Sequence, residues 1–150
     1  MRKILFILLF LPMLLLESCS KDDDLAQVEI SLEISGVAKS GNNLYTIQGE
    51  DVSVDKIEVT SLTDQNAIIQ RVVFSLDGFP LPINIENPFT TSFSTEDLRV
   101  GQHNLGMSGV VLQVDKTLTD VHVSVPIIIV ESEADLPEDA TEIGTVIVTP

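Results

Sequence analysis

The chain has 150 residues and a formal net charge of −15 at pH 7. This length suits one domain with a single hydrophobic core. A surface this acidic repels phosphate backbones, so the composition argues against nucleic acid as a partner.

The N-terminal segment has the features of an export signal. Two cations, Arg2 and Lys3, precede the uncharged run Ile4–Leu16. A helix needs about 20 apolar residues to cross about 30 Å of hydrocarbon, so this run is too short to span a bilayer. A short apolar run behind a basic start is typical of a secretory signal peptide. We therefore expect residues 1–18 to be a signal peptide.

Cys19, the only cysteine, follows this run directly. A lone cysteine in an exported protein implies a partner chain, a free thiol or a modification. The sequence "LESC" resembles the lipobox of bacterial lipoproteins, in which the chain is cut before the cysteine and lipid is attached to it. The resemblance implies lipid attachment at Cys19. One acyl chain holds a protein marginally and two hold it stably, so the protein would be bound to a membrane through its N-terminal lipid.

An acidic segment comes next. It consists of Ser20, Lys21, Asp22, Asp23 and Asp24. Its composition is that of a solvated tether, which we assign to residues 19–27. It also resembles the export signal that follows the cysteine in surface-displayed lipoproteins of Bacteroidota. That resemblance implies an outer-membrane protein that faces outward.

From residue 28 the apolar residues alternate with polar ones. "VEISLEIS" (28–35) predicts a strand with one wet face, and "GVAKSGNN" (36–43) predicts a loop. The apolar phase changes between Val54 and Ile57, which predicts a β-bulge near Asp55-Lys56.

The later segments continue the strand pattern. "VVFSLDG" (72–78) ends in a predicted turn, and the prolines of "FPLPINIENP" (79–88) suit the edge of a sheet. "HNLGMSGVV" (103–111) places alternate residues, His103 to Val111, on one apolar face. In "VHVSV" (121–125) the valines share one face and His122 lies on the other. No segment has a sustained helical period, and the turn spacing favours an all-β sandwich.

The order of "VVFSLDG", "NPFTTSF" and "EDLRVGQHNLGM" resembles that of bacterial immunoglobulin-like (Ig-like) domains. The matching positions are Asp77-Gly78, Pro88-Phe89, Leu98, Gly101, His103 and Leu105. The resemblance covers 44–130 and implies an Ig-like antiparallel β-sandwich, which we assign to 28–130. It does not imply an activity.

The last twenty residues, 131–150, differ in composition from this domain. The stretch from Glu131 to Glu142 is acidic and contains no basic residue, so it is typical of a linker. It is followed by "GTVIVT" (144–149), a possible terminal strand. This strand would either pack at an edge of the sandwich or form a frayed end.

Few residues have the chemistry of catalysis. His103 lies on an apolar face, which predicts a structural histidine with a backbone partner. His122 is expected to be exposed. No cluster of Cys and His has zinc spacing, and no segment matches the EF-hand pattern. The stretches "EDVSVD" (50–55) and "DQN" (64–66) could still offer oxygen ligands to calcium, but acids in loops are more often solvated. We expect no catalytic residue, no metal, no cofactor and no enzyme activity.

The expected function is that of a lipid-anchored surface lipoprotein whose domain is a non-catalytic binding or structural module of the outer envelope. One alternative is an accessory glycan-binding lipoprotein of a polysaccharide-capture system. Sugars stack on exposed aromatic rings, and Tyr45 and Phe79 are the candidate contacts. A hydrolase, which would need a pocket joining a histidine to a carboxylate, is the other alternative. The partner, an envelope protein or a glycan, is not specified by these residues.

Overall fold

The computed structural model describes residues 28–61, 67–86, 89–113 and 118–149, and almost all of its regular structure is β. The strands are β1 (Val28–Ser40), β2 (Asn43–Ile47), β3 (Asp51–Ser61), β4 (Ile68–Leu76), β5 (Phe79–Pro80), β6 (Thr91–Ser94), β7 (Gly101–Leu112), β8 (Leu118–Val130) and β9 (Gly144–Val148), with one 3₁₀ turn, η1 (Glu133–Asp135). Within these ranges no helix has the length and apolarity to cross a bilayer.

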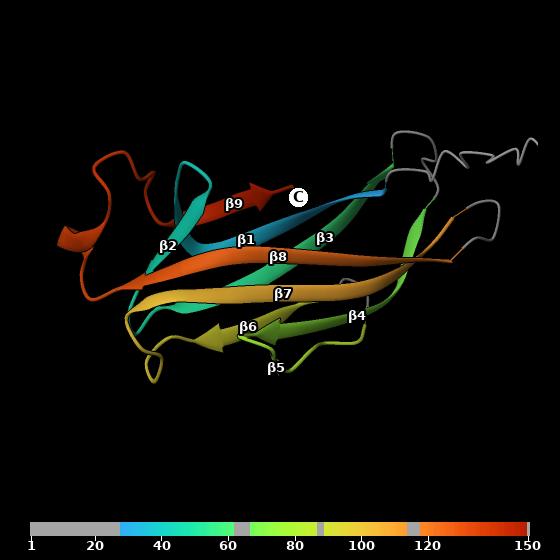
Figure 1. The fold of residues 1–150 in the computed structure, drawn as a ribbon, viewed down its shortest axis with the longest axis horizontal. Coiled ribbons are helices and arrows are strands. Elements are labelled where there is room, and N and C mark those ends of the chain that lie inside the picture. Colours follow the sequence, from blue (N-terminus) through green and yellow to red (C-terminus); the bar gives the residue numbers. More distant parts are fainter. Residues whose placement is uncertain (1–27, 62–66, 87–88, 114–117, 150) are drawn as a thin grey trace, which may run out of the picture.

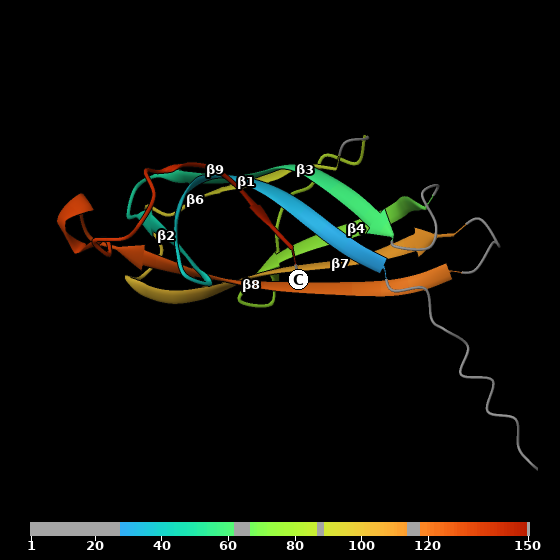
Figure 2. The same cartoon turned by 90° about the horizontal axis from the view of Figure 1, so that it is seen from above.

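The strands form two packed layers (Figures 1 and 2). One layer contains β9, β1, β3 and β6, and the other has the order β5-β4-β7-β8-β2. The layers are continuous where β1 changes partner, because its first part pairs with β3 and its last residues pair with β2. The predicted all-β, Ig-like sandwich is confirmed. Strands β1, β3 and β6 lie in one of its two sheets and strands β4, β7 and β8 in the other.

Among the strands that the structure describes, the predicted antiparallel pairing holds for every pair but one. Strand β2 runs parallel to β8, with Leu44 opposite Ile127 and Ile47 opposite Val130. A parallel pair requires a long connection between its strands. Here that connection is the whole domain between β2 and β8.

The prediction of a loop over 36–43 is wrong. Strand β1 continues to Ser40, and only Gly41 and Asn42 form the turn to β2. The cause is Gly36, whose positive φ of 79° bends the strand without ending it. Val37 and Ala38 are fully buried just beyond this bend. A glycine-rich stretch therefore carries β1 from one layer to the other.

The predicted bulge is confirmed at Asp55. Glu33 pairs with Lys56 and Ile34 pairs with Val54, so Asp55 is the extra residue on β3. The Asp55 carboxylate accepts a hydrogen bond of 2.5 Å from the Ser35 hydroxyl. The extra residue shifts the inward positions of β3 by one, which explains the change of apolar phase.

The core lies between the two layers and is mainly aliphatic. The alternation predicted for β1, β7 and β8 is confirmed, because the residues expected to point inward are buried or partly buried. The largest fully buried side chains include Phe74, Ile30, Leu32, Ile34, Leu44, Leu105, Met107, Ile127 and Ile129. Among the described residues Phe74 is the fully buried aromatic side chain, and the partly buried Phe89 and Phe93 pack against the core.

The C-terminal segment returns to the domain. Strand β9 pairs antiparallel with β1, with Leu32 opposite Val148 and Ile34 opposite Val146. The preceding connection is held to the end of β1, because the Ser40 hydroxyl donates to the Asp139 carboxylate at 2.7 Å. The run "GTVIVT" thus contributes an edge strand to the first layer.

Candidate functional site

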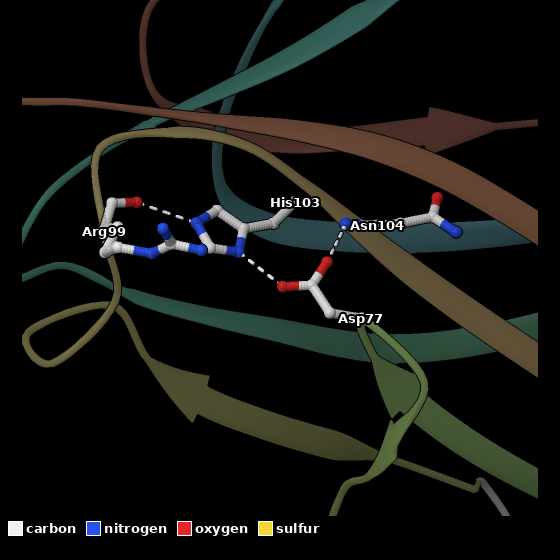
Figure 3. A network of polar contacts seen from close by, with 4 residues as sticks. All are labelled: Asp77, Arg99, His103 and Asn104. Carbon is white, nitrogen blue, oxygen red and sulfur yellow. Dashed lines mark hydrogen bonds and ion pairs between the residues drawn. The ribbon is translucent and has the colours of Figure 1, made fainter.

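The histidine on the apolar face of β7 lies at the centre of a polar cluster (Figure 3). His103 Nδ1 lies 2.7 Å from Asp77 Oδ2, and His103 Nε2 lies 2.7 Å from the Arg99 carbonyl oxygen. We call Asp77, His103 and the Arg99 carbonyl the His103 clip. It joins the β4–β5 turn to the connection between β6 and β7.

The turn sequence fixes the position of Asp77. Asp77 and Gly78 both have positive φ, 50° and 84°, and they connect the paired residues Leu76 and Phe79. A two-residue hairpin loop with this geometry is a type I′ turn, for which Asp-Gly is a preferred sequence. The Asp77 carboxylate also accepts the Asn104 backbone N–H at 2.8 Å, and its own N–H donates to the Asn104 carbonyl at 2.9 Å. The turn is thereby fastened to β7 beside His103.

The partners of His103 determine its charge. A carboxylate and a carbonyl oxygen can only accept hydrogen bonds, so both ring nitrogens must carry a proton. Burial lowers the pKa of His103, but the hydrogen bonds to the Arg99 carbonyl and to Asp77 outweigh burial and raise it above 6.5. The hydrogen bond from His103 lowers the pKa of Asp77. The geometry is therefore that of an imidazolium–carboxylate pair.

This arrangement leaves His103 without a site for a reacting proton. A general base needs a ring nitrogen with a free lone pair that faces the substrate. In His103 one nitrogen is directed at Asp77 and the other at a backbone carbonyl, and only 9 % of the side chain is exposed. The predicted backbone partner of His103 is confirmed, and it is the Arg99 carbonyl. The carboxylate partner of His103 was missed, because the sequence does not give the register that places Asp77 beside β7.

The second histidine lies on the outer face of β8, as predicted. His122 is exposed and is paired with Ser108 across the β7–β8 ladder. The Ser108 hydroxyl and His122 Nδ1 are 3.1 Å apart. Catalysis by such a pair requires a third group that orients the base and a site that excludes water. A cross-strand pair on an open sheet face has the geometry of a surface contact.

The two aromatic candidates lie at opposite edges of the second layer. Phe79 is 76 % exposed on β5, whereas Tyr45 is half-buried on β2. Strands β4, β7 and β8 separate them. The structure does not bring them together as one stacking surface, although Phe79 is exposed at the turn as expected.

A groove that sequence reasoning missed lies beside the bulge in β3. It has a volume of about 530 Å³. Its lining consists of Ser53–Asp55, Pro82–Asn84 and Thr90–Ser92. One wall is held in place because the Thr91 hydroxyl donates to the Pro82 carbonyl at 2.6 Å. The lining combines hydroxyls, an amide and one carboxylate with a small apolar surface. The sequence indicated the change of phase at Asp55 and the proline-rich stretch 79–88, but not that the two would lie side by side.

The remaining predicted site residues cannot be placed. Cys19 and the segment from Ser20 to Asp24 lie outside the described residues. In the part of the chain that the structure describes, no three residues among Asp, Glu, His and Cys are grouped as they would be around a metal ion.

Comparison with known proteins gives little beyond this geometry. No protein-family model matches the chain, and no curated protein matches it. One similar solved structure is that of the fibronectin(III)-like modules of Clostridium thermocellum CbhA, with 15 % sequence identity and a TM-score of 0.42. The match covers 70 % of the present chain and half the length of that structure. So distant a likeness transfers no ligand, partner or activity.

Proposed function

We propose that this protein is an exported lipoprotein, anchored by lipid on Cys19, whose Ig-like domain serves as a non-catalytic binding or structural module on the outer face of the cell envelope. The observation that carries the proposal is the position of the single cysteine. Cys19 stands directly after the short apolar run and directly before the acidic segment. A signal peptide, a lipid attachment site and a hydrophilic tether follow one another in the order that such an anchor requires.

The start of the folded domain supports this order. The first strand begins at Val28, so nine residues from Cys19 to Gln27 lie between the anchor and the sandwich. A fully extended residue spans at most about 3.6 Å, which limits the tether to about 30 Å. The domain would stand next to the membrane surface, within reach of envelope partners.

The state of the two histidines supports a non-catalytic role. Both ring nitrogens of His103 are bonded within the clip. His122 lies on an exposed sheet face, where its Nδ1 is within hydrogen-bond distance of the Ser108 hydroxyl. A hydrolase built on a histidine would need one of these rings to face a substrate pocket.

A surface-shaving assay on intact cells tests the location. We expect the wild type to be membrane-bound and cut by added protease, and Cys19→Ser to be released from membranes. Replacing Asp22, Asp23 and Asp24 by Ala should leave the protein membrane-bound but protected. Removing three exposed acids elsewhere, Glu131, Glu133 and Glu138, controls for the change in total charge and should leave shaving unchanged. A wild type that resists protease would place the domain in the periplasm and contradict surface display.

Glycan binding is the second candidate function, and the groove beside β3 supports it. Hydroxyl, amide and carboxylate groups line this groove, and such groups bind sugar hydroxyls. Electrophoresis through gels containing a soluble polysaccharide tests the idea. Retardation of the wild type that is lost in Asp55→Ala but kept in Phe79→Ala would assign the groove to glycan binding. Equal mobility with and without polysaccharide would exclude the polysaccharides tested.

A further inference from the structure

An apolar row crosses the outer face of the second layer at one end of the domain. Ile68 pairs with Leu112, and Leu112 pairs with Leu118, so three large aliphatic side chains lie side by side on β4, β7 and β8. Ile68 is 56 % exposed and Leu118 is 61 % exposed, while Leu112 between them is half-buried. We call these three residues the apolar row. Val111, adjacent to Leu112, is fully buried, which confirms that the row faces away from the core.

The character of this face changes along the strands. The next row pairs Arg71, Val110 and Asp120, and the row beyond it pairs Val73, Ser108 and His122. The large aliphatic side chains are thus followed by one cation and one anion, and then by smaller or polar side chains. A graded face of this kind suits a boundary between an apolar medium and water.

The apolar row lies at the end of the domain where the chain enters it. Strand β1 begins at Val28, at the same end at which β7 finishes and β8 starts (Figures 1 and 2). With 13 residues at about 3.3 Å each, β8 is about 43 Å long, more than the tether can span. A lipid on Cys19 would therefore hold this end, and not the end that carries the His103 clip, close to the bilayer.

We propose that the apolar row is a membrane-contact surface, which inserts Ile68 and Leu118 into the headgroup region of the bilayer and sets the orientation of the domain. This inference rests on the proposed anchor at Cys19. The preferred surface is a zwitterionic one, because a chain with a net charge of −15 is repelled by anionic lipid. The same charge opposes the pairing of two copies through this face.

Tryptophan fluorescence provides a direct test, since the natural chain contains no tryptophan. The chain from Cys19 to Pro150, carrying Leu118→Trp, is coupled through its only thiol to a maleimide lipid in phosphatidylcholine vesicles. We expect its emission to shift to shorter wavelength and to be quenched when the acyl chains are brominated. Val100→Trp, at a 47 % exposed position just before β7 and at the opposite end, is the matched control and should show neither change. Adding Ile68→Ser to Leu118→Trp should reduce the quenching.

Three results would overturn the proposal. The first is a Leu118→Trp emission that matches the Val100→Trp control in vesicles. The second is an emission shift that appears without vesicles and grows with protein concentration, which would show that a second copy of the chain, and not the bilayer, covers the apolar row. The third is quenching that is equal for phosphatidylcholine and for anionic phosphatidylglycerol vesicles and unaffected by Ile68→Ser. In this experiment the chemical coupling supplies the anchor, so a negative result would refute membrane contact by the apolar row without refuting lipidation of Cys19 in cells. Absence of acyl chains on Cys19 in cells would instead refute both the proposed function and this orientation.

Discussion

Replacing Asp77 by Asn removes the charge that faces His103 and leaves the β4–β5 turn in place. Asn tolerates the positive φ of this position, and Asn-Gly is as well suited to a type I′ turn as Asp-Gly. The side-chain oxygen of Asn can still accept the Asn104 N–H. The change in stability therefore reports the ion pair within the His103 clip.

The exposure of the two partners sets the magnitude. A hydrogen bond to a charged group contributes about 1.5–3 kcal/mol when buried, and an exposed ion pair contributes about 0.2–1 kcal/mol. His103 is 9 % exposed, but Asp77 is 42 % exposed and water screens its charge. We expect a coupling of about 1 kcal/mol between the two side chains. For a domain of this size that corresponds to about 3–5 °C in Tm.

The pKa shifts give this coupling a pH dependence. The pKa of His103 is raised above 6.5, so its stabilising contribution is complete below that pH and is lost as the pH rises through the folded-state value. The pKa of Asp77 is lowered below 3.8, so its contribution is present above that pH and is lost as the pH falls through the folded-state value. The clip is therefore strongest between about pH 4 and pH 6.5.

A double-mutant cycle measures the effect. The wild type, Asp77→Asn, His103→Gln and the double variant are unfolded in urea, with far-UV circular dichroism as the signal, at about pH 5.5 and about pH 9. The coupling should be about 1 kcal/mol at the lower pH and fall by at least half at the higher pH. A coupling that is the same at both pH values, or absent at about pH 5.5, would refute the assignment of an imidazolium–carboxylate pair.

Three further substitutions test the packing. Gly36→Ala should destabilise the domain by more than about 2 kcal/mol in urea unfolding, because φ is positive and an added Cβ would lie 2.0 Å from the Asp51 carbonyl oxygen. Gly49→Ala is the control, since φ is also positive there but the added Cβ meets nothing within 4 Å. A smaller loss of stability in Gly36→Ala than in Gly49→Ala would contradict this prediction. Thr46→Val should raise the stability by about 1 kcal/mol, because the buried Thr46 hydroxyl has no hydrogen-bond partner among the described residues; an unchanged or lower Tm would contradict this. Phe74→Ala should cost about 3–5 kcal/mol, because Phe74 is a large and fully buried core side chain. A loss below about 1 kcal/mol would show that the core is not packed around it.

Local patterns predicted the strands because the period of two reflects burial directly. The inward residues of β7, from His103 to Val111, alternate without a break, and they are buried as expected. The Asp-Gly turn and the bulge at Asp55 also follow from neighbouring residues alone. In each case the physical cause lies within a few positions of its effect.

Pairing between distant strands could not be read from the sequence. The parallel alignment of β2 with β8 joins residues about eighty positions apart in the chain, Leu44 and Ile127. The partnership of Asp77 with His103 depends on the register of β4 against β7. The role of Gly36 as a bend within β1 depends on the sheet that β1 joins next, so the same glycine-rich stretch would suit a loop equally well.

In the candidate site, too, features that depend on neighbouring residues were predictable and features that depend on strand pairing were not. A structural role for His103 was predictable from its apolar neighbours along β7, and exposure of Phe79 was predictable from its place after a turn. The groove beside β3 was not predictable, because the fold places residues 82–84 and 90–92 next to the bulge to form it. The apolar row was not predictable either, because Ile68, Leu112 and Leu118 become neighbours only when β4, β7 and β8 pair.

The central claim is that lipid on Cys19 anchors this domain, and the mass of the N-terminal peptide of the protein purified from membranes tests it most directly. The proposal predicts a chain that begins at Cys19, with a mass increased by a diacylglyceryl group and a further acyl chain on that residue. A mature chain that begins elsewhere, or a Cys19 that carries a free thiol, would contradict it.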